Sequence, residues 1–176
     1  LAVIGPSVFN GCSALTSIKL PDIITTIGKY AFQKCIALES IALPKKITTI
    51  SGCLFNGCTS LSSVVIPEGV VNIEYDAFNN CSAMEKIVLP IGVKNIGNEA
   101  FMGCKALKEI TLPDSITTIG DKAFQYAGLT KLTLPKGLKT IGVQAFFECK
   151  SLHKTAIPEG VTSVGRSAFS GCAALE

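Results

Sequence analysis

Cysteine is the residue of this sequence whose number and spacing are best suited to chemistry. Seven of the eight cysteines recur at an almost constant interval, at Cys12, Cys35, Cys58, Cys81, Cys104, Cys149 and Cys172. In one copy the same slot holds Ala127, so the slot accepts a small apolar group, as the sites of buried free cysteines often do. Disulfides and a metal site are the alternatives, but seven thiols in one register leave one without a partner. We expect a ladder of buried free thiols.

Cys53 lies outside this ladder. Its slot is held in the other copies by residues typical of a solvent-facing position, namely Tyr30, Asp76, Glu99, Lys122, Gln144 and Ser167. Together with Cys58 it forms a C-x-x-x-x-C spacing, which is a weak zinc signal because no second cysteine pair and no histidine lie nearby. We therefore expect Cys53 to be an exposed, reactive thiol.

The usual signatures of an enzyme are missing. His153 is the only histidine, so a Ser–His–Asp or Cys–His arrangement has a single candidate base, and its slot has a surface composition. The four aspartates are scattered over several slots of the repeat, and the glycines follow the repeat spacing instead of forming a phosphate-binding loop. The sequence predicts a protein without catalytic activity, cofactor or metal.

The composition argues against two further classes. The chain has 16 basic and 13 acidic residues, a net charge of +3, and all but one of the basic residues are lysines. This balance is too mild to favour nucleic-acid binding. No apolar run approaches the ~20 residues that span a bilayer, and no signal peptide is present. Because the sequence begins at Leu1 without an initiator Met, we expect it to be a piece of a longer protein.

An internal repeat explains the regular spacing of the cysteines. Phenylalanine recurs every 23 residues, with one interval of 22, at Phe9, Phe32, Phe55, Phe78, Phe101, Phe124, Phe146 and Phe169. Proline follows the same rhythm, including the shorter step, at Pro21, Pro44, Pro67, Pro90, Pro113, Pro135 and Pro158. Two markers that shift together predict a single repeat domain over residues 1–176. Its copies start near residues 15, 38, 61, 84, 107, 129 and 152.

Each copy contains three segments. The motif L-x-x-I-x-L-P ends in an alternating pattern that predicts a short strand, which the proline then terminates. A second extended segment reads I-T-T-I-G in its clearest copies, and the last segment, from Tyr30 to Cys35 in one copy, suggests a single turn of α or 3-10 helix. A unit this small must stack on its neighbours to bury its apolar face. We expect a solenoid, a right-handed coil with parallel strands in successive repeats and the phenylalanines in line at its core.

These motifs resemble the BspA-like leucine-rich repeats of bacterial and protist surface proteins. The shared features are the L-x-x-I-x-L-P strand, the I-G step and the A-F-x-x-C turn, and the resemblance covers essentially the whole chain. It implies a leucine-rich-repeat fold and a cell-surface or secreted protein that acts in adhesion. The corresponding function is non-catalytic binding of a protein or glycan. An intracellular scaffold or ligand-recognition domain that uses the same strand face is the alternative.

A binding face is expected where the third and fifth residues of L-x-x-I-x-L point away from the core. The third slot changes from serine to mainly lysine along the chain, and the fifth slot has an apolar centre. The candidate binding residues are Ser17, Lys19, Ser40, Ser63, Val65, Lys86, Val88, Glu109, Thr111, Lys131, Thr133 and Lys154. An acidic protein or glycan segment would suit this face, although a merely solvated surface is the alternative. Because the sequence starts and stops inside a repeat, we also expect end-to-end self-association.

Overall fold

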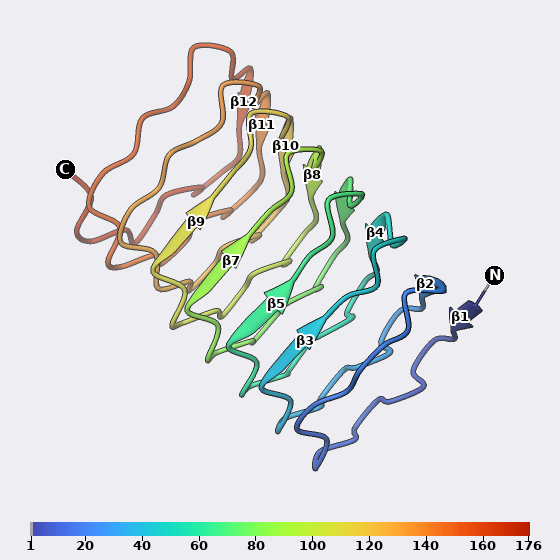
Figure 1. The fold of residues 1–176 in the computed structure, drawn as a ribbon. Coiled ribbons are helices and arrows are strands. Elements are labelled where there is room, and N and C mark those ends of the chain that lie inside the picture. Colours follow the sequence, from blue (N-terminus) through green and yellow to red (C-terminus); the bar gives the residue numbers. More distant parts are fainter. Residues whose placement is uncertain (1) are drawn as a thin grey trace.

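The computed structural model describes residues 2–176, and it is a stack of similar coils. Figure 1 shows the chain winding from coil to coil in one direction, with the two termini at opposite ends of the stack. The strands are β1 (Ala2–Ile4), β2 (Ile24–Ile27), β3 (Ser40–Ala42), β4 (Thr49–Ile50), β5 (Ser63–Val65), β6 (Asn72–Ile73), β7 (Lys86–Val88), β8 (Asn95–Ile96), β9 (Glu109–Thr111), β10 (Thr118–Ile119), β11 (Thr140–Ile141) and β12 (Ser163–Val164). Residues 2–176 contain no helix that is long and apolar enough to cross a lipid bilayer.

All strands pair in parallel with the equivalent strand of a neighbouring coil. The I-T-T-I segments form the longest sheet, in the order β12-β11-β10-β8-β6-β4, while β1 pairs with β2 separately. The L-x-x-I-x-L segments form only the pairs β3–β5 and β7–β9, followed by isolated bridges from Glu109 to Lys131 and from Lys131 to Lys154. The predicted strand face therefore exists, but its hydrogen-bonded ladder is interrupted.

The phenylalanine ladder is the centre of the core, as predicted. Consecutive rings stack with centroids 5.0 to 5.7 Å apart and planes inclined by 2 to 17°. The six inner rings, from Phe32 to Phe146, are fully buried, whereas Phe9 and Phe169 are partly buried. Each fully buried ring contributes about 2–3 kcal/mol of gross transfer free energy, so this ladder is a main source of cohesion between coils.

The predicted helical turn in each repeat is wrong. Two residues of this segment have positive φ in every coil, for example Tyr30 at 62° and Lys34 at 58°, and a right-handed helix cannot contain them. The amides between Gly28 and Cys35 alternate between two kinds of partner. The amide of Gln33 bonds within the coil, to Tyr30 O, whereas the amide of Phe32 bonds to Leu54 O of the next coil. The segment is a series of turns that is hydrogen-bonded to its neighbours.

The proline of each repeat begins a tight turn. The amide of Ile47 donates to Pro44 O at 3.2 Å, and the same bond recurs after the other prolines, as from Val70 to Pro67 O. Proline is thus the first residue of the turn, although a Pro-x-Gly sequence would also suit a turn with proline second. The proline carbonyl accepts the hydrogen bond that closes this turn. Proline has no amide hydrogen to donate, so the strand ends there without losing a hydrogen bond.

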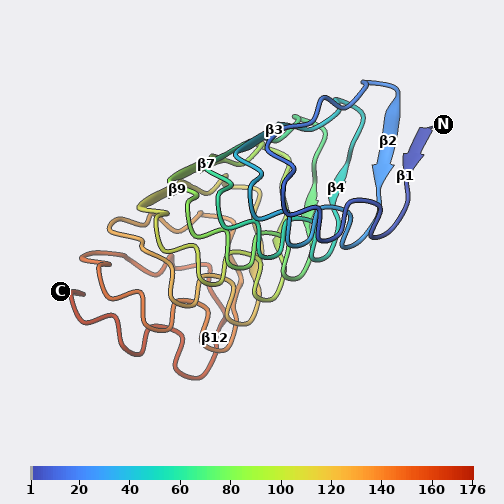
Figure 2. The same ribbon diagram turned by 90° about the horizontal axis from the view of Figure 1, so that it is seen from below.

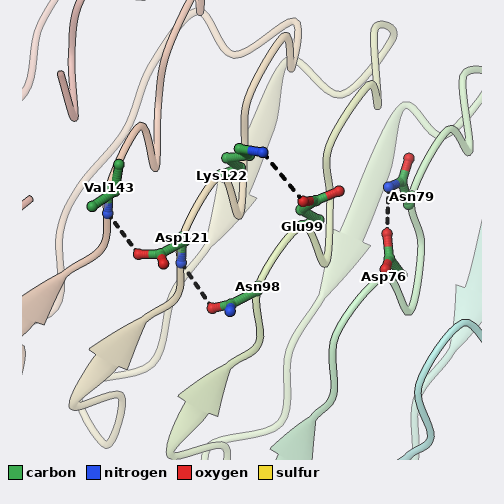
Figure 3. A network of polar contacts seen from close by, with 7 residues as sticks. All are labelled: Asp76, Asn79, Asn98, Glu99, Asp121, Lys122 and Val143. Atoms are coloured by element: carbon green, nitrogen blue, oxygen red, sulfur yellow. Dashed lines mark hydrogen bonds and ion pairs between the residues drawn. The ribbon is translucent and has the colours of Figure 1, made fainter. Parts of the chain in front are cut away.

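Polar side chains near the start of the turn segment tie neighbouring coils together. Figure 3 shows Asn98 Oδ1 accepting a hydrogen bond from the amide of Asp121 at 2.9 Å, and Asp121 Oδ1 accepting one from the amide of Val143 at 2.7 Å. Lys122 and Glu99, also from adjacent coils, form an ion pair at 3.5 Å. Backbone amides left free in one coil are therefore satisfied by the side chains of the previous one.

Candidate functional site

The L-x-x-I-x-L segments present their third and fifth residues to solvent. In β3, β5, β7 and β9 the central residue is buried and the two flanking residues are exposed. Figure 2 shows β3, β7 and β9 along one side of the stack, away from β4 and β12. We call this side the strand face. All twelve candidate residues of the strand face, from Ser17 to Lys154, are exposed.

The middle of the strand face is hollow and apolar. A depression of about 570 Å³ lies over β5 and β7. Val65 and Val88 line it with exposed fractions of 65% and 61%, and Ile66, Ile87 and Pro90 contribute further apolar surface. The predicted apolar centre of the face is therefore a concave patch, of the kind that marks binding sites in soluble proteins.

Two more hollows continue this patch along the stack. One, of about 480 Å³, lies towards the N-terminus between Leu20 and Pro67 and shares Val65 with the central hollow. The other, of about 210 Å³, lies towards the C-terminus and is lined by Glu109, Thr111, Lys131 and Thr133 among others. The three hollows follow the fifth slot from coil to coil, so a row of hollows runs along the strand face parallel to the stack.

The lysines of the strand face form no ion pair within the described part of the chain. The parallel register places Lys86 beside Glu109, Glu109 beside Lys131, and Lys131 beside Lys154. Within residues 2–176 the ion pairs involve other lysines, namely Lys29, Lys45, Lys122 and Lys150. The face therefore carries unneutralised positive charge towards its C-terminal end.

Two acidic residues of the central hollow were not among the candidates. Glu85 precedes β7 and Glu68 follows Pro67, and both line the depression around Val65 and Val88. The second slot of L-x-x-I-x-L, which holds Glu85, has a polar composition, and this was the available signal. Composition could not show that the slot borders a hollow, because that depends on the heights of side chains in neighbouring coils.

The expectation that Cys53 is exposed is wrong. Cys53 is only 5% exposed, and tyrosines of the coils on both sides lie next to it. The Tyr30 phenol interacts with Cys53 and Tyr75, and the hydrogen bond with Tyr75 is the main reason why the pKa of Tyr30 rises to about 12. A Cβ added at Gly52 would lie 2.7 Å from the Tyr75 ring, so this ring packs directly against Gly52, the residue before Cys53. Burial, followed by the charge of Asp76, raises the pKa of the Cys53 thiol.

The ladder cysteines are free and, apart from Cys12, buried, as predicted. Each buried thiol donates to the carbonyl of the preceding coil's phenylalanine at 3.0 to 3.2 Å, as Cys58 Sγ does to Phe32 O. Burial raises the pKa of Cys58, Cys104 and Cys149 to about 12. These thiols are therefore structural hydrogen-bond donors in the core and not nucleophiles. Residues 2–176 hold no group of three His, Cys, Asp or Glu that could bind a metal.

Sequence comparison identifies the repeat. A family model described as "BspA type Leucine rich repeat region", with six copies of the repeat, matches residues 1–90 and 71–176. The comparison with curated proteins gave no match.

Solved structures have the same fold. A leucine-rich repeat protein from Bacteroides ovatus is 35% identical with a TM-score of 0.91, and the match covers 97% of this chain and 45% of that one. A Treponema pallidum leucine-rich repeat protein is 30% identical with a TM-score of 0.90, covering 99% of this chain and 82% of that one. A leucine-rich cell surface protein from Faecalibacterium prausnitzii is 32% identical with a TM-score of 0.83, and the match covers 93% of this chain and 43% of that one. This chain thus spans less than half the length of two of these relatives.

Proposed function

Because this chain belongs to the family of BspA-type leucine-rich repeat proteins, we propose that it is a non-catalytic module that binds a protein or glycan on its strand face. The observation that supports this most strongly is the line of three hollows around Val65 and Val88. A row of partly apolar hollows is unusual on a surface that only meets water. The unpaired lysines beside it would attract an acidic partner and orient it.

We further propose a cell-surface or secreted location and a role in adhesion. The Faecalibacterium prausnitzii relative is described as a cell surface protein, and the family resemblance points the same way. The alternative is an intracellular recognition domain, which the eight free thiols favour because oxidising surroundings promote disulfides. A signal peptide or cell-wall anchor in the full-length gene product would support the adhesin, and a neighbouring catalytic domain without such signals would support the alternative.

Charge reversal tests the strand face. The triple variant Lys86→Glu, Lys131→Glu, Lys154→Glu should weaken binding to a ligand found by screening matrix proteins and glycans, and it should reduce the salt dependence of binding. The matched control is Lys94→Glu, Lys105→Glu, Lys139→Glu, which makes the same charge change at exposed lysines outside the strand face. Surface plasmon resonance at two salt concentrations measures both effects, and circular dichroism checks the fold. Binding that responds only to the control triple would place the site on another face.

A further inference from the structure

The strand face has two parts with different chemistry. The central hollow is apolar at Val65 and Val88, and its charged border consists of Glu68, Glu85 and Lys86. Two coils further on, the face is basic, with Lys131 and Lys154 exposed. A ligand that fits both parts must place an apolar group in the hollow and a negative charge at Lys131 and Lys154. The reverse arrangement is disfavoured, because Glu68 and Glu85 outnumber Lys86 at the hollow.

The two lysines form a like-charged pair. Lys131 and Lys154 are register partners in adjacent coils, which lie about 4.8 Å apart in a parallel sheet. Like charges in directly opposed positions repel each other. Glu109 is the register partner of Lys131 on its other side, but no ion pair forms between them within residues 2–176. A bound carboxylate would remove this repulsion.

We propose that the strand face binds an extended peptide segment that runs along the stack, with an apolar side chain in the central hollow and acidic side chains at Lys131 and Lys154. This inference rests on the proposed function and specifies its ligand. From Val88 to Lys131 the separation is two coils, or about 10 Å, and from Val65 to Lys154 it is four coils, or about 19 Å. An extended chain covers these distances in about three and about six residues. The segment therefore has an apolar residue followed or preceded, about three residues away, by an acidic stretch.

Other ligand classes fit less well. The three hollows are lined without any aromatic side chain, on which the apolar faces of neutral sugars usually pack. An anionic glycan could neutralise the lysines, but it has no side chain to fill the hollow around Val65 and Val88. A peptide combines both groups in one short segment.

Synthetic peptides test the proposal directly. The probe is a fluorescein-labelled peptide with two leucines, a two-residue spacer and three aspartates, compared with peptides that lack either the leucines or the aspartates. Fluorescence anisotropy should show binding that weakens about tenfold or more in either truncated peptide, and by a similar factor in the protein variants Val88→Asp and Lys131→Glu, Lys154→Glu. The matched controls are Val3→Asp, whose side chain is also 61% exposed but lies in β1, and Lys94→Glu, Lys139→Glu. The control variants should bind the peptide with an affinity within about twofold of that of the unaltered protein.

Each other outcome overturns the proposal. A sulfated oligosaccharide that binds more tightly than the peptide, is lost in Lys131→Glu, Lys154→Glu and ignores Val88→Asp would identify an anionic glycan as the ligand. Peptide binding that is equal in all variants would exclude a specific peptide site. In both cases the proposed function stands if binding of a ligand from the screen still depends on the residues of the strand face. If binding of that ligand responds only to the control variants, the proposed function fails together with the peptide proposal.

Discussion

The buried thiols link the protonation of cysteine to the stability of the stack. Each donates its proton to a carbonyl of the preceding coil and lies in an apolar environment, so a thiolate cannot form there without loss of that bond. Cys104 shows this most clearly, because burial raises its pKa from 9.0 to about 12. In the unfolded chain the same thiol ionises near its ordinary pKa, about 8.5.

The free energy of unfolding should therefore fall as the solution becomes alkaline. The raised pKa means that the contribution of Cys104 is fully present below about pH 8.5 and is lost as the pH rises from there towards about 12, since the unfolded chain then binds fewer protons. Between about pH 7.5 and pH 10, the Cys104→Ala variant should lose about 2 kcal/mol less of its free energy of unfolding than the unaltered protein loses. Urea denaturation at the two pH values measures this difference.

The chain offers a matched counterpart in the same slot. Ala127 occupies the cysteine position of its coil and is buried, so Ala127→Cys should make the alkaline loss of stability larger by a similar amount. Equal pH dependence in the three proteins would mean that the ladder thiols are accessible to hydroxide in the folded state, contrary to their burial.

At the level of the element, the turn segment depends on two left-handed residues in each coil. The second of these positions holds glycine in half of the coils, at Gly11, Gly57, Gly103 and Gly171, and other residues with φ of 58 to 61° in the rest, at Lys34, Asn80, Tyr126 and Glu148. A residue with a Cβ is strained in this conformation, whereas glycine is not. The non-glycine coils therefore carry a backbone cost that the stacking of their neighbours offsets.

Glycine exchange measures this cost. Lys34→Gly should stabilise the protein by about 0.5–1 kcal/mol, because it relieves the left-handed strain and keeps the bond from the Lys34 amide to Asn56 O. The reverse change, Gly11→Ala, should destabilise by about 1 kcal/mol through backbone strain alone, since no atom lies within 4 Å of the added Cβ. Urea denaturation of the two variants gives both values. A destabilising Lys34→Gly would show that the lysine side chain contributes more than the strain costs.

The stacked strands were predictable from sequence, but the turns and the cover of Cys53 were not. Regular phenylalanines and prolines demand equivalent positions in successive coils, so the core and the outward residues Val65 and Val88 followed from the repeat alone. The left-handed turns hold Tyr30 and Lys34, whose types do not favour positive φ, and only the recurrent glycine in one slot indicated them. Cys53 is buried although its slot is otherwise polar, and it lies beside Tyr75, which is 22 residues further along the chain and packs against Gly52.

At the scale of the whole molecule, the stack has an open edge at each end. β1 pairs only with β2, and β12 pairs only with β11, so each presents unpaired backbone groups. Unpaired edges invite association with other strands. A protein of residues 1–176 should therefore form concentration-dependent oligomers by end-to-end contact, as light scattering over a range of concentrations would show.

A single proline should reduce this association. The amides of Ser163 and Gly165 bond to Lys139 O and Ile141 O of the preceding coil, which leaves the amide of Val164 on the open side of β12. Val164→Pro removes that donor without breaking a bond to β11, whereas Ser163→Pro would break the bond to Lys139 O and leave the open amide of Val164 in place. A protein that is monomeric at every concentration, with or without Val164→Pro, would contradict the end-to-end contact.

The stacking of coils also determines how the molecule would respond to mechanical load. The termini lie at opposite ends of the stack, and each coil is held only by its neighbours, so a pull on the two ends passes through every coil interface in series (Figure 1). An end coil, with one neighbour, yields first. Each coil that peels away frees 23 residues, or about 80 Å of extended chain, while the remaining coils stay folded. Under tension the rod would act as a tether that lengthens in equal steps.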